Sequence, residues 1–367
     1  MSPTQPQPLS GPFVWDGAAL AEDASWRMAW SAAELAELDA ALAAVKARGL
    51  AWHEVAREDF PLEAVAAKLA RVADELEEGR GVVKLTGFPV QDYGPADLEI
   101  LWFGLARHLG RPLHQDCNGQ LLREIRDQGA DPGVDLAARH GSLAGGPQGG
   151  PQGGAEFLSS KARTYSSGAL RFHTDRCDVV GLLTLGQAAS GGISKVASTA
   201  AVHNAILARR PDLLDELYRP IWRSRLGEEA GGEAAVYALP VFGLEGGKLT
   251  SHYSRTYIEA AQLQPGTPPM TEAQWQALDL LAAQAERLVF TMRLAPGDMQ
   301  FLNNHAVYHA RTPFRDDPAT GRVRRLYRVW LAMANSRALP ADHAVLWREV
   351  RAGALRGGIG QHGVPAD

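Results

Sequence analysis

The sequence predicts an α+β fold with a mainly β core, a double-stranded β-helix (jelly roll) with N-terminal and inserted helices. Three observations lead to this fold class. The front of the chain has helical periodicity, the second half contains short apolar runs broken by glycine and turn residues, and helical segments are inserted between those runs. Short runs of this kind are typical of antiparallel strands and do not fit the regular strand–helix alternation of a parallel sheet.

Residues 1–79 are predicted to form a helical region packed on the core. Ser31 and Glu34 have the spacing of a capping box, and the alanine-rich segment after them stops at Gly49. A second helix is indicated by apolar residues three and four positions apart. These residues are Leu62, Val65, Leu69, Val72 and Leu76.

The core domain is predicted over residues 80–340. It opens with a β-branched strand at 81–88 and a periodic helix at 95–110. A Gly/Pro/Gln segment at 144–155 contains the repeat GGPQGGPQGG, which has no apolar side chain to bury. We therefore expect a flexible loop there.

The part of the core after this loop is predicted to contain most of the sheet. The expected strands are ALRFH (169–173), VVGLLTLGQAA (179–189), SKVAS (194–198), RLVFTMRL (287–294), MQFLNN (299–304) and VRRLYRVWLAM (323–333). Helices are expected at 199–209 and 211–218, and Thr271 caps another that reaches Arg287. Residues 341–367 are predicted to be a C-terminal tail, and no boundary divides the chain into independent domains.

Composition excludes several classes of partner. The chain has 367 residues, a formal net charge of −5 and 46% hydrophobic residues, and no basic stripe offers a site for nucleic acid. It shows no secretory signal and no membrane-spanning apolar run, so we expect a cytoplasmic protein with a small-molecule partner. Cys117 and Cys177 are too few for a cysteine-rich site, so any metal must be held mainly by His, Asp or Glu. Homo-oligomerisation is left open.

The stretch RFHTDRCD contains His173 and Asp175, two positions apart on a predicted strand, so both side chains should face the same way. Two ligands from one strand can meet at one ion. A second pair of this kind, His114 and Asp116, is flanked by turn signals and is expected in a loop. By itself, a His-x-Asp pair is more commonly a surface hydrogen bond than a metal site.

Two downstream segments strengthen the metal interpretation. MQFLNNHAVYHARTPF offers His305 and His309 as a third ligand, and two histidines with one carboxylate form the facial triad of non-haem iron(II) oxygenases. In RVRRLYRVWL, Arg324 and Arg328 are four positions apart and share one face of a predicted strand. An inward guanidinium is costly to bury unless it meets an anion.

Taken together, FHTD, SGGIS, NNHAVYHAR and RRLYR resemble the taurine dioxygenase-like (TauD/TfdA) branch of the iron(II)/2-oxoglutarate-dependent oxygenases, over roughly residues 80 to 335. The resemblance implies a cupin-like double-stranded β-helix. It also implies that His173, Asp175 and His309 hold Fe(II), and that Ser194 and Arg324 hold 2-oxoglutarate. Arg328 matches a position that often reaches the substrate or its neighbouring carboxylate.

Two assignments have rivals within the sequence. Arg325 would take the role of Arg324 if the strand register shifted by one residue. His305 competes with His309, but His309 precedes Ala310 and Arg311 as the family's distal histidine usually does. Four further residues flank the predicted strand that carries His173 and are candidates for the wall of a substrate pocket: Tyr165, Ser166, Arg176 and Asp178.

The implied activity is an Fe(II)- and 2-oxoglutarate-dependent dioxygenase that uses O2 to oxidise, most often to hydroxylate, a C–H bond. The arginines favour a small anionic substrate such as an amino acid, sulfonate or carboxylate, and succinate and CO2 would be released. The alternatives are a zinc-dependent hydrolase on the same three ligands and a non-catalytic β-barrel binding protein. Desaturation, cyclisation and cleavage would use the same ligands, so the sequence leaves them open.

Overall fold

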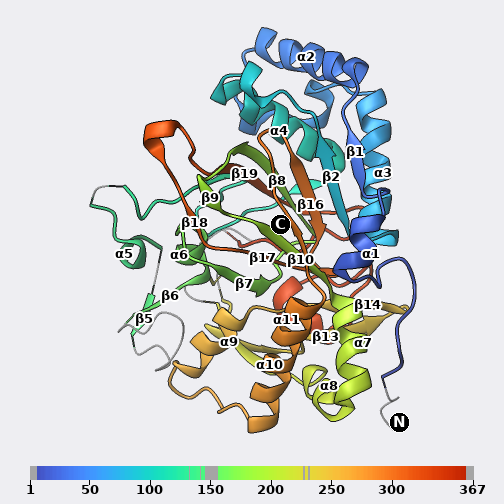
Figure 1. The fold of residues 1–367 in the computed structure, drawn as a ribbon, viewed down its shortest axis with the longest axis vertical. Coiled ribbons are helices and arrows are strands. Elements are labelled where there is room, and N and C mark those ends of the chain that lie inside the picture. Colours follow the sequence, from blue (N-terminus) through green and yellow to red (C-terminus); the bar gives the residue numbers. More distant parts are fainter. Residues whose placement is uncertain are drawn as a thin grey trace.

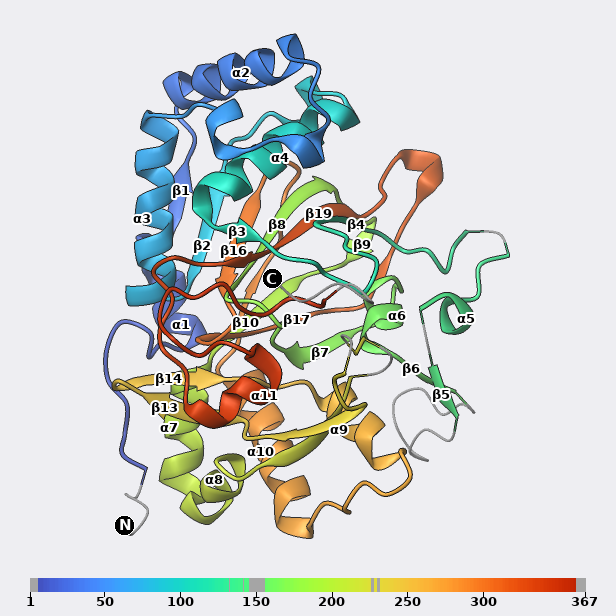
Figure 2. The same cartoon turned by 180° about the vertical axis from the view of Figure 1, so that it is seen from behind.

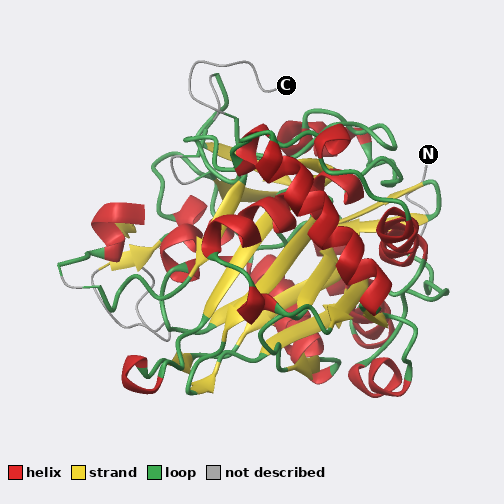
Figure 3. Cartoon of the chain, turned by 90° about the horizontal axis from the view of Figure 1, so that it is seen from above, coloured by secondary structure: helices red, strands yellow, loops and turns green. Residues whose placement is uncertain are grey.

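The computed structural model of the chain describes residues 6–131, 133–140, 142–144, 156–225, 228–229 and 232–360. Strands fill the middle of the molecule, and helices lie above and below them in Figure 1. Seen from above, in Figure 3, helices cover the strands. The predicted α+β class with a strand-rich core is confirmed.

The larger sheet has the strand order β1-β2-β16-β8-β19-β3, and β4 also pairs with β19. All its pairs are antiparallel except β1 with β2. Its central strands come from distant parts of the sequence, so the sheet forms only when the two halves of the chain meet. The strands are β1 (Arg27–Ala29), β2 (Val82–Thr86), β3 (Arg111–Pro112), β4 (Leu122–Ile125), β8 (Val179–Gly186), β16 (Met299–Asn303) and β19 (Arg325–Ala332).

The smaller sheet has the order β15-β10-β17-β7, and all its pairs are antiparallel. Its register places His309 opposite His173, and Arg311 opposite Ser194. This pairing brings two segments far apart in the sequence side by side. The strands are β7 (Leu170–His173), β10 (Ser194–Ser198), β15 (Phe290–Met292) and β17 (Val307–Arg311).

An apolar layer joins the two sheets. Val180 and Trp330 of the larger sheet belong to the same buried cluster as Val196 and Val307 of the smaller one. Side chains alternate across each strand, so the opposite faces of both sheets need their own cover. Helices provide this cover on each side.

The N-terminal helices cover the outer face of the larger sheet, where Leu183, Phe301 and Val329 pack into one cluster with helical side chains. Helices from the middle of the chain cover the smaller sheet, around Phe172 and Tyr308. The first group is α2 (Ala32–Ala47), α3 (Ala64–Glu78) and α4 (Pro95–Leu109), and the second is α7 (Thr199–Arg209), α8 (Pro211–Leu217), α9 (Arg255–Gln262) and α10 (Glu272–Arg287).

Local signals located the helix ends well. The Ser31 side chain accepts a hydrogen bond from the Glu34 backbone N–H, and the predicted capping box is present. Gly49, just beyond the end of α2, has φ +68°, a left-handed conformation that favours glycine. The remaining helices are α1 (Gly17–Glu22), α5 (Leu136–His140), α6 (Ser160–Thr164) and α11 (Ala344–Trp347).

Two-stranded pairs and helical turns complete the fold. The paired strands are β5 (Ser142–Ala144) with β6 (Glu156–Leu158), β9 (Ser190–Gly191) with β18 (Phe314–Arg315), β11 (Ile221–Ser224) with β12 (Val236–Leu239), and β13 (Phe242–Glu245) with β14 (Lys248–Ser251). The 3-10 turns are η1 (Trp52–Glu54), η2 (Arg57–Asp59), η3 (Val90–Asp92), η4 (Pro318–Thr320) and η5 (Ala341–His343). Nearly all of the Gly/Pro/Gln segment, residues 145–155, lies outside the described residues.

The segment after β19 crosses the back of the molecule (Figure 2) and packs closely against it. The buried Arg356 side chain donates from Nε to Asp178 Oδ1 at 2.8 Å. The Gly358 N–H donates to the Arg176 carbonyl at 2.7 Å, and the Ile359 N–H to the His114 carbonyl at 2.9 Å. The described part of the predicted tail is therefore anchored beside the strand that carries His173.

Candidate metal centre

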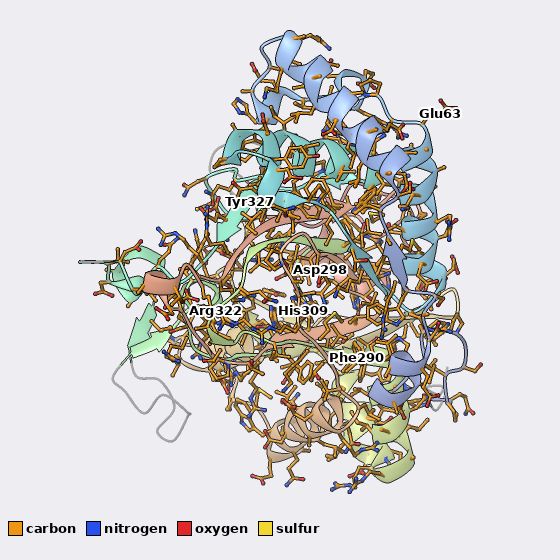
Figure 4. The ribbon with its side chains drawn as sticks, turned by 45° about the horizontal axis from the view of Figure 1, so that its top comes forward. Glu63, Phe290, Asp298, His309, Arg322 and Tyr327 are labelled. Carbon is orange, nitrogen blue, oxygen red and sulfur yellow. The ribbon has the colours of Figure 1, made fainter. Side chains whose placement is uncertain are left out.

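Three side chains meet at the edge of the smaller sheet. His173, Asp175 and His309 each offer one ligand atom, and these atoms all lie within 4.8 Å of one another. His173 Nε2 lies 3.9 Å from Asp175 Oδ1, and His309 Nε2 lies 3.7 Å from Asp175 Oδ2. Figure 4 shows His309 in the interior, whereas Glu63 projects from the surface. The arrangement offers two imidazoles and one carboxylate to a single ion.

The two histidines come from paired strands, but Asp175 lies beyond the end of its strand. β7 stops at His173, and the Thr174 N–H then donates to the Tyr253 carbonyl at 2.8 Å instead of continuing the sheet. The sequence predicted both residues of the pair on one strand. The change of hydrogen-bond partner at Thr174 explains the difference, and the two side chains still converge.

Hydrogen bonds orient the ligand atoms. His173 Nδ1 lies 2.9 Å from the Arg171 carbonyl, which can only accept a hydrogen bond, so the Nδ1 proton points there and Nε2 keeps its lone pair for a metal. Asp175 is held through its backbone N–H, which donates to Asn304 Oδ1 at 2.9 Å, and through its Oδ2, which accepts from Trp330 Nε1 at 3.1 Å.

The protonation states suit a cation. Burial opposes ionisation of Asp175, but Arg328, His309 and His173 together outweigh burial, and the pKa of the carboxyl is lowered. Burial lowers the pKa of His309 to about 3, and the neighbouring His173 contributes to this shift. At neutral pH, the centre therefore offers a carboxylate and a neutral imidazole, the forms that bind metals.

The rival histidine lies elsewhere. His305 is fully buried, its Nε2 is 2.9 Å from Asp178 Oδ1, and its Nδ1 is 2.7 Å from Thr250 Oγ1. Asp178 also accepts from Arg356 and from the Met333 N–H. His305 and Asp178 thus belong to a separate buried network that joins the C-terminal segment to the sheets.

A cavity of about 610 Å³, including its mouth, borders the triad and is called the Arg324 cavity. Its wall includes Ser194, Arg311 and Arg324 together with the triad. Arg324 Nη1 and the Nε and Nη1 of Arg311 are buried and have no hydrogen-bond partner among the described residues. Burial, with a contribution from Arg311, lowers the pKa of Arg324 to about 9. Two buried guanidiniums with unused donors indicate a site for an anion.

Ser194 and Gln300 supply uncharged polar groups in the same cavity. Gln300 Nε2 donates to Ser194 Oγ at 3.1 Å, and Gln300 Nε2 also lies 3.1 Å from Met292 Sδ. The apolar side chains Leu182, Leu294 and Leu326 line the rest of the wall. A small anion would therefore be bound by polar groups at one end and shielded by hydrocarbon around its chain.

The register of β19 separates the candidate arginines. Arg325 turns outward and donates from Nε to Glu124 Oε1 at 2.6 Å, whereas Leu326 and Arg328 are buried. Arg324, the residue just before β19, lines the Arg324 cavity together with Arg328. The one-residue ambiguity left by the sequence thus resolves in favour of Arg324 as the cavity residue.

A second cavity, of about 690 Å³ including its mouth, also borders the triad and is called the Lys161 cavity. Its wall shares Thr164, His173, Asp175 and Arg328 with the Arg324 cavity. The two cavities therefore meet at His173, Asp175 and Arg328, whereas His309 lines the Arg324 cavity. The cationic side chains of the Lys161 cavity are Arg123, Lys161, Arg176, Arg225 and Arg328.

Of the four flanking candidates for the pocket wall, Arg176 lines the Lys161 cavity. Asp178 is buried in the His305 network, the Tyr165 ring belongs to the core cluster between the sheets, and the Ser166 carbonyl accepts from Arg311 at 2.8 Å. Cys177 is fully buried and its Sγ accepts from Asn304 Nδ2 at 3.1 Å, as expected of a packed thiol.

Two residues were missed from the sequence: Arg311, which lines the Arg324 cavity, and Asp116, which contacts cations of the Lys161 cavity. Arg311 lies two positions after His309 on one strand, a spacing that could have shown that both side chains face the same way. The turn signals around His114 and Asp116 predict a loop, and Asp116 does lie in a loop. In that loop it contacts Arg123 and Lys161. No local pattern links that loop to the triad.

Residues 46–330 match the model of a family described as "Taurine catabolism dioxygenase TauD, TfdA family". One relative is the FR-33289 synthase of Streptomyces rubellomurinus, 28% identical over 342 residues, which cover 92% of this chain and 94% of the relative. Another is the taurine hydroxylase-like protein SAT17 of Stachybotrys chartarum, 27% identical over 315 residues, which cover 83% and 75% of the two chains.

Solved structures share the fold. Asparagine oxygenase in complex with Fe(II), 3-hydroxyasparagine and succinate has a TM-score of 0.59 at 17% identity, covering 90% of this chain and 100% of the other. The non-haem iron oxygenase OrfP in complex with Fe and alpha-ketoglutaric acid has a TM-score of 0.57 at 15% identity, covering 83% and 93%. Across the described residues, no helix combines the length and apolar character needed to cross a membrane.

Proposed function

Because this chain belongs to the taurine catabolism dioxygenase (TauD, TfdA) family, we propose that it hydroxylates a C–H bond of a small anionic substrate at a centre formed by His173, Asp175 and His309. It is an iron(II)- and 2-oxoglutarate-dependent oxygenase. We therefore no longer retain the two alternatives that the sequence left open, a zinc-dependent hydrolase and a non-catalytic β-barrel binding protein.

One observation carries the proposal. The three side chains converge at the junction of two cavities, one lined by guanidiniums with unused donors and the other rich in cationic groups. The donor set fits iron(II), since a facial triad leaves coordination positions open for other ligands. When bound, iron(II), 2-oxoglutarate and dioxygen supply the oxidation of a C–H bond, with release of succinate and carbon dioxide.

Residues of this chain would bind the co-substrate in the Arg324 cavity. The unused Nη1 of Arg324 would donate to the distal carboxylate of 2-oxoglutarate, and Ser194 Oγ would donate a further hydrogen bond. We add Arg311 to this set because its Nε and Nη1 are also buried and unpartnered among the described residues. The apolar wall excludes water from the rest of the cavity and so strengthens these charge-assisted contacts.

The substrate would enter the Lys161 cavity and present its C–H bond at the triad. Arg328 lies between the cavities, donates from Nε to Gln115 Oε1 at 2.7 Å and keeps Nη1 3.8 Å from Asp175 Oδ2. Its guanidinium is thus fixed in orientation before any ligand binds, which lowers the cost of ordering an anionic substrate. The substrate class we favour is an amino acid, sulfonate or carboxylate.

The organisation that we propose is a single domain, in which residues 1–79 pack on the 80–340 core. The buried cluster shared by the N-terminal helices and the larger sheet supports this organisation. A cytoplasmic location stays a prediction, to be checked by cell fractionation.

The proposal is tested by adding iron(II) and 2-oxoglutarate to the protein without oxygen and recording the visible charge-transfer band. The wild type should give the band, and His173→Ala and Asp175→Ala should lose it because each removes one ligand. His305→Gln is the matched control, since His305 lies outside the triad, and it should retain the band. A band that survives in His173→Ala, or one that disappears in His305→Gln while the protein stays folded, would overturn the assignment.

A further inference from the structure

The Lys161 cavity contains more cationic groups than an ordinary polar pocket, and they are arranged in pairs. Arg123 Nη2 donates to Asp116 Oδ2 at 2.6 Å, and Lys161 Nζ donates to the same oxygen at 3.2 Å. One carboxylate oxygen therefore serves two cations. This pair is left with one positive charge in excess.

The opposite pair repeats the pattern. Arg176 Nη2 donates to Glu233 Oε1 at 2.9 Å, and Arg225 Nη1 lies 3.5 Å from Glu233 Oε2. Arg176 Nε and Arg225 Nη1 are both buried and have no hydrogen-bond partner within the described residues. Arg176 therefore keeps an unused donor, and Arg225 Nη1 has only its ion pair with Glu233, although water reaches neither atom.

Arg328 adds a fifth cation, at the end of the cavity beside the triad. Its nearest carboxylate is Asp175, which we assign to the metal. Among the described residues, the remaining carboxylate in the wall of the Lys161 cavity is Glu228. Glu229 also interacts electrostatically with Arg225. Burial raises the pKa of Glu228 to about 7, so its charge is only partly present at neutral pH. The wall is left with an excess of positive charge at Arg328 and at the two cation pairs, where Glu228 offsets it only in part.

We propose that the substrate is a small dianion, with one anionic group at Arg328 beside the metal centre and a second at Lys161 and Arg123 in the same cavity. This inference rests on the proposed function and names its substrate class. Lys161 and Arg123 are then specificity-determining residues. A buried anionic group gains most where cations are already fixed and incompletely neutralised.

The test compares acids of similar length that differ at one end. Glutarate, 3-sulfopropionate and 3-phosphonopropionate carry a second anionic group, whereas butyrate ends in a methyl group. Their binding to the iron(II)-loaded protein is measured by calorimetry without oxygen, with just enough 2-oxoglutarate present to saturate the charge-transfer band. At least one dianion should bind about tenfold or more tightly than butyrate. The best-binding head group then identifies the second anion as carboxylate, sulfonate or phosphonate.

Lys161→Met and Lys195→Met form a matched pair of variants. Both lysines are about equally exposed, at 20% and 17% of the side chain, and both pair with a carboxylate, but Lys195 faces Glu286 on α10. Lys161→Met should weaken the best dianion about tenfold and leave butyrate unchanged, whereas Lys195→Met should change neither. Equal affinities for butyrate and all three dianions, or equal effects of the two variants, would overturn the inference.

Glu228→Gln provides a change in the opposite direction, which a folding defect cannot imitate. It removes the negative charge that faces Arg123, Lys161 and Arg176, so the best dianion should bind more tightly. Unchanged or weaker binding to this variant would count against the inference. Loss of the charge-transfer band in the wild type would instead contradict the proposed function, so the two failures are distinguishable.

Discussion

At the scale of single residues, Arg324 and Arg325 are neighbours with opposite surroundings. Arg324 is enclosed in its cavity with Nη1 unpartnered among the described residues, and Arg325 makes an exposed ion pair with Glu124. Arg324 immediately precedes β19 and Arg325 is its first residue, and the two side chains diverge at this end of the strand. The same substitution at the two positions should therefore have very different consequences.

Arg324→Met should raise the dissociation constant for 2-oxoglutarate at least about tenfold, because a buried charge-assisted hydrogen bond contributes about 1.5–3 kcal/mol. Arg325→Met should change it less than about twofold, since exposed ion pairs contribute little. Titration of the charge-transfer band measures both constants without any substrate. A larger effect from Arg325→Met would mean that the register of β19 is not as described.

The ligand residues themselves could be proposed from the sequence, but their surroundings could not. His173, Asp175 and His309 occur in short motifs whose residue types and order carry information. Their partners Asn304, from the turn after β16, and Trp330, from β19, reach Asp175 from distant parts of the chain, so only the folded chain reveals them. Arg311 could have been found from its spacing to His309, but its unused donors are visible only once the cavity exists.

At the scale of elements, helices were predicted more accurately than strands. The helix at 199–209 has the expected bounds, and the capping boxes of α2 and α10 are formed, because caps and periodicity are local. The strand expected at 287–294 shortens to Phe290–Met292, because α10 extends to Arg287 and β15 pairs only where β10 lies opposite. Strand ends depend on distant partners that the sequence does not identify.

The anchoring of the C-terminal segment also depends on a distant contact. Asp178, at the start of β8, accepts hydrogen bonds from His305 and from Arg356, and all three side chains are buried. Nothing in the local sequence links position 356 to position 178. This buried network joins the C-terminal segment to the sheets, so we expect it to increase the free energy of unfolding.

Protonation of His305 should make this network pH-sensitive. Burial lowers the pKa of His305 from 6.5 to about 4, although its hydrogen bond to Asp178 opposes the shift. The unfolded chain therefore takes up a proton at a pH where the folded chain does not. The contribution of His305 is fully present above about pH 6.5 and is lost as the pH falls toward 4, with a slope of at most about 1.4 kcal/mol per pH unit.

Chemical denaturation between pH 7.5 and 4.5 measures this effect. The free energy of unfolding of His305→Gln should fall less steeply with decreasing pH than that of the wild type, because glutamine does not titrate. His53→Gln is the control, since His53 is exposed, and its pH dependence should follow that of the wild type. Parallel curves for His305→Gln and the wild type would show that folding does not lower the pKa of His305.

At the scale of the whole molecule, the arrangement of sheets creates the site. The sequence predicted the class of fold from its short apolar runs, but the order β15-β10-β17-β7 and the pairing of His309 with His173 arise from contacts between distant segments. The two cavities exist because the edge of this sheet meets loops from both halves of the chain. Neither cavity could have been derived from periodicity or from motifs.

A metal held by His173, Asp175 and His309 would link β17 to the end of β7, so binding should stabilise the whole fold. A ligand that binds only the folded state adds about 2.7 kcal/mol when its free concentration is 100 times the dissociation constant. Iron(II) added without oxygen should therefore raise the unfolding midpoint of the wild type, and a chelator should reverse the change. His173→Ala should show no such increase, whereas His305→Gln should show the full one. An equal increase in His173→Ala would place the stabilising metal elsewhere in the molecule.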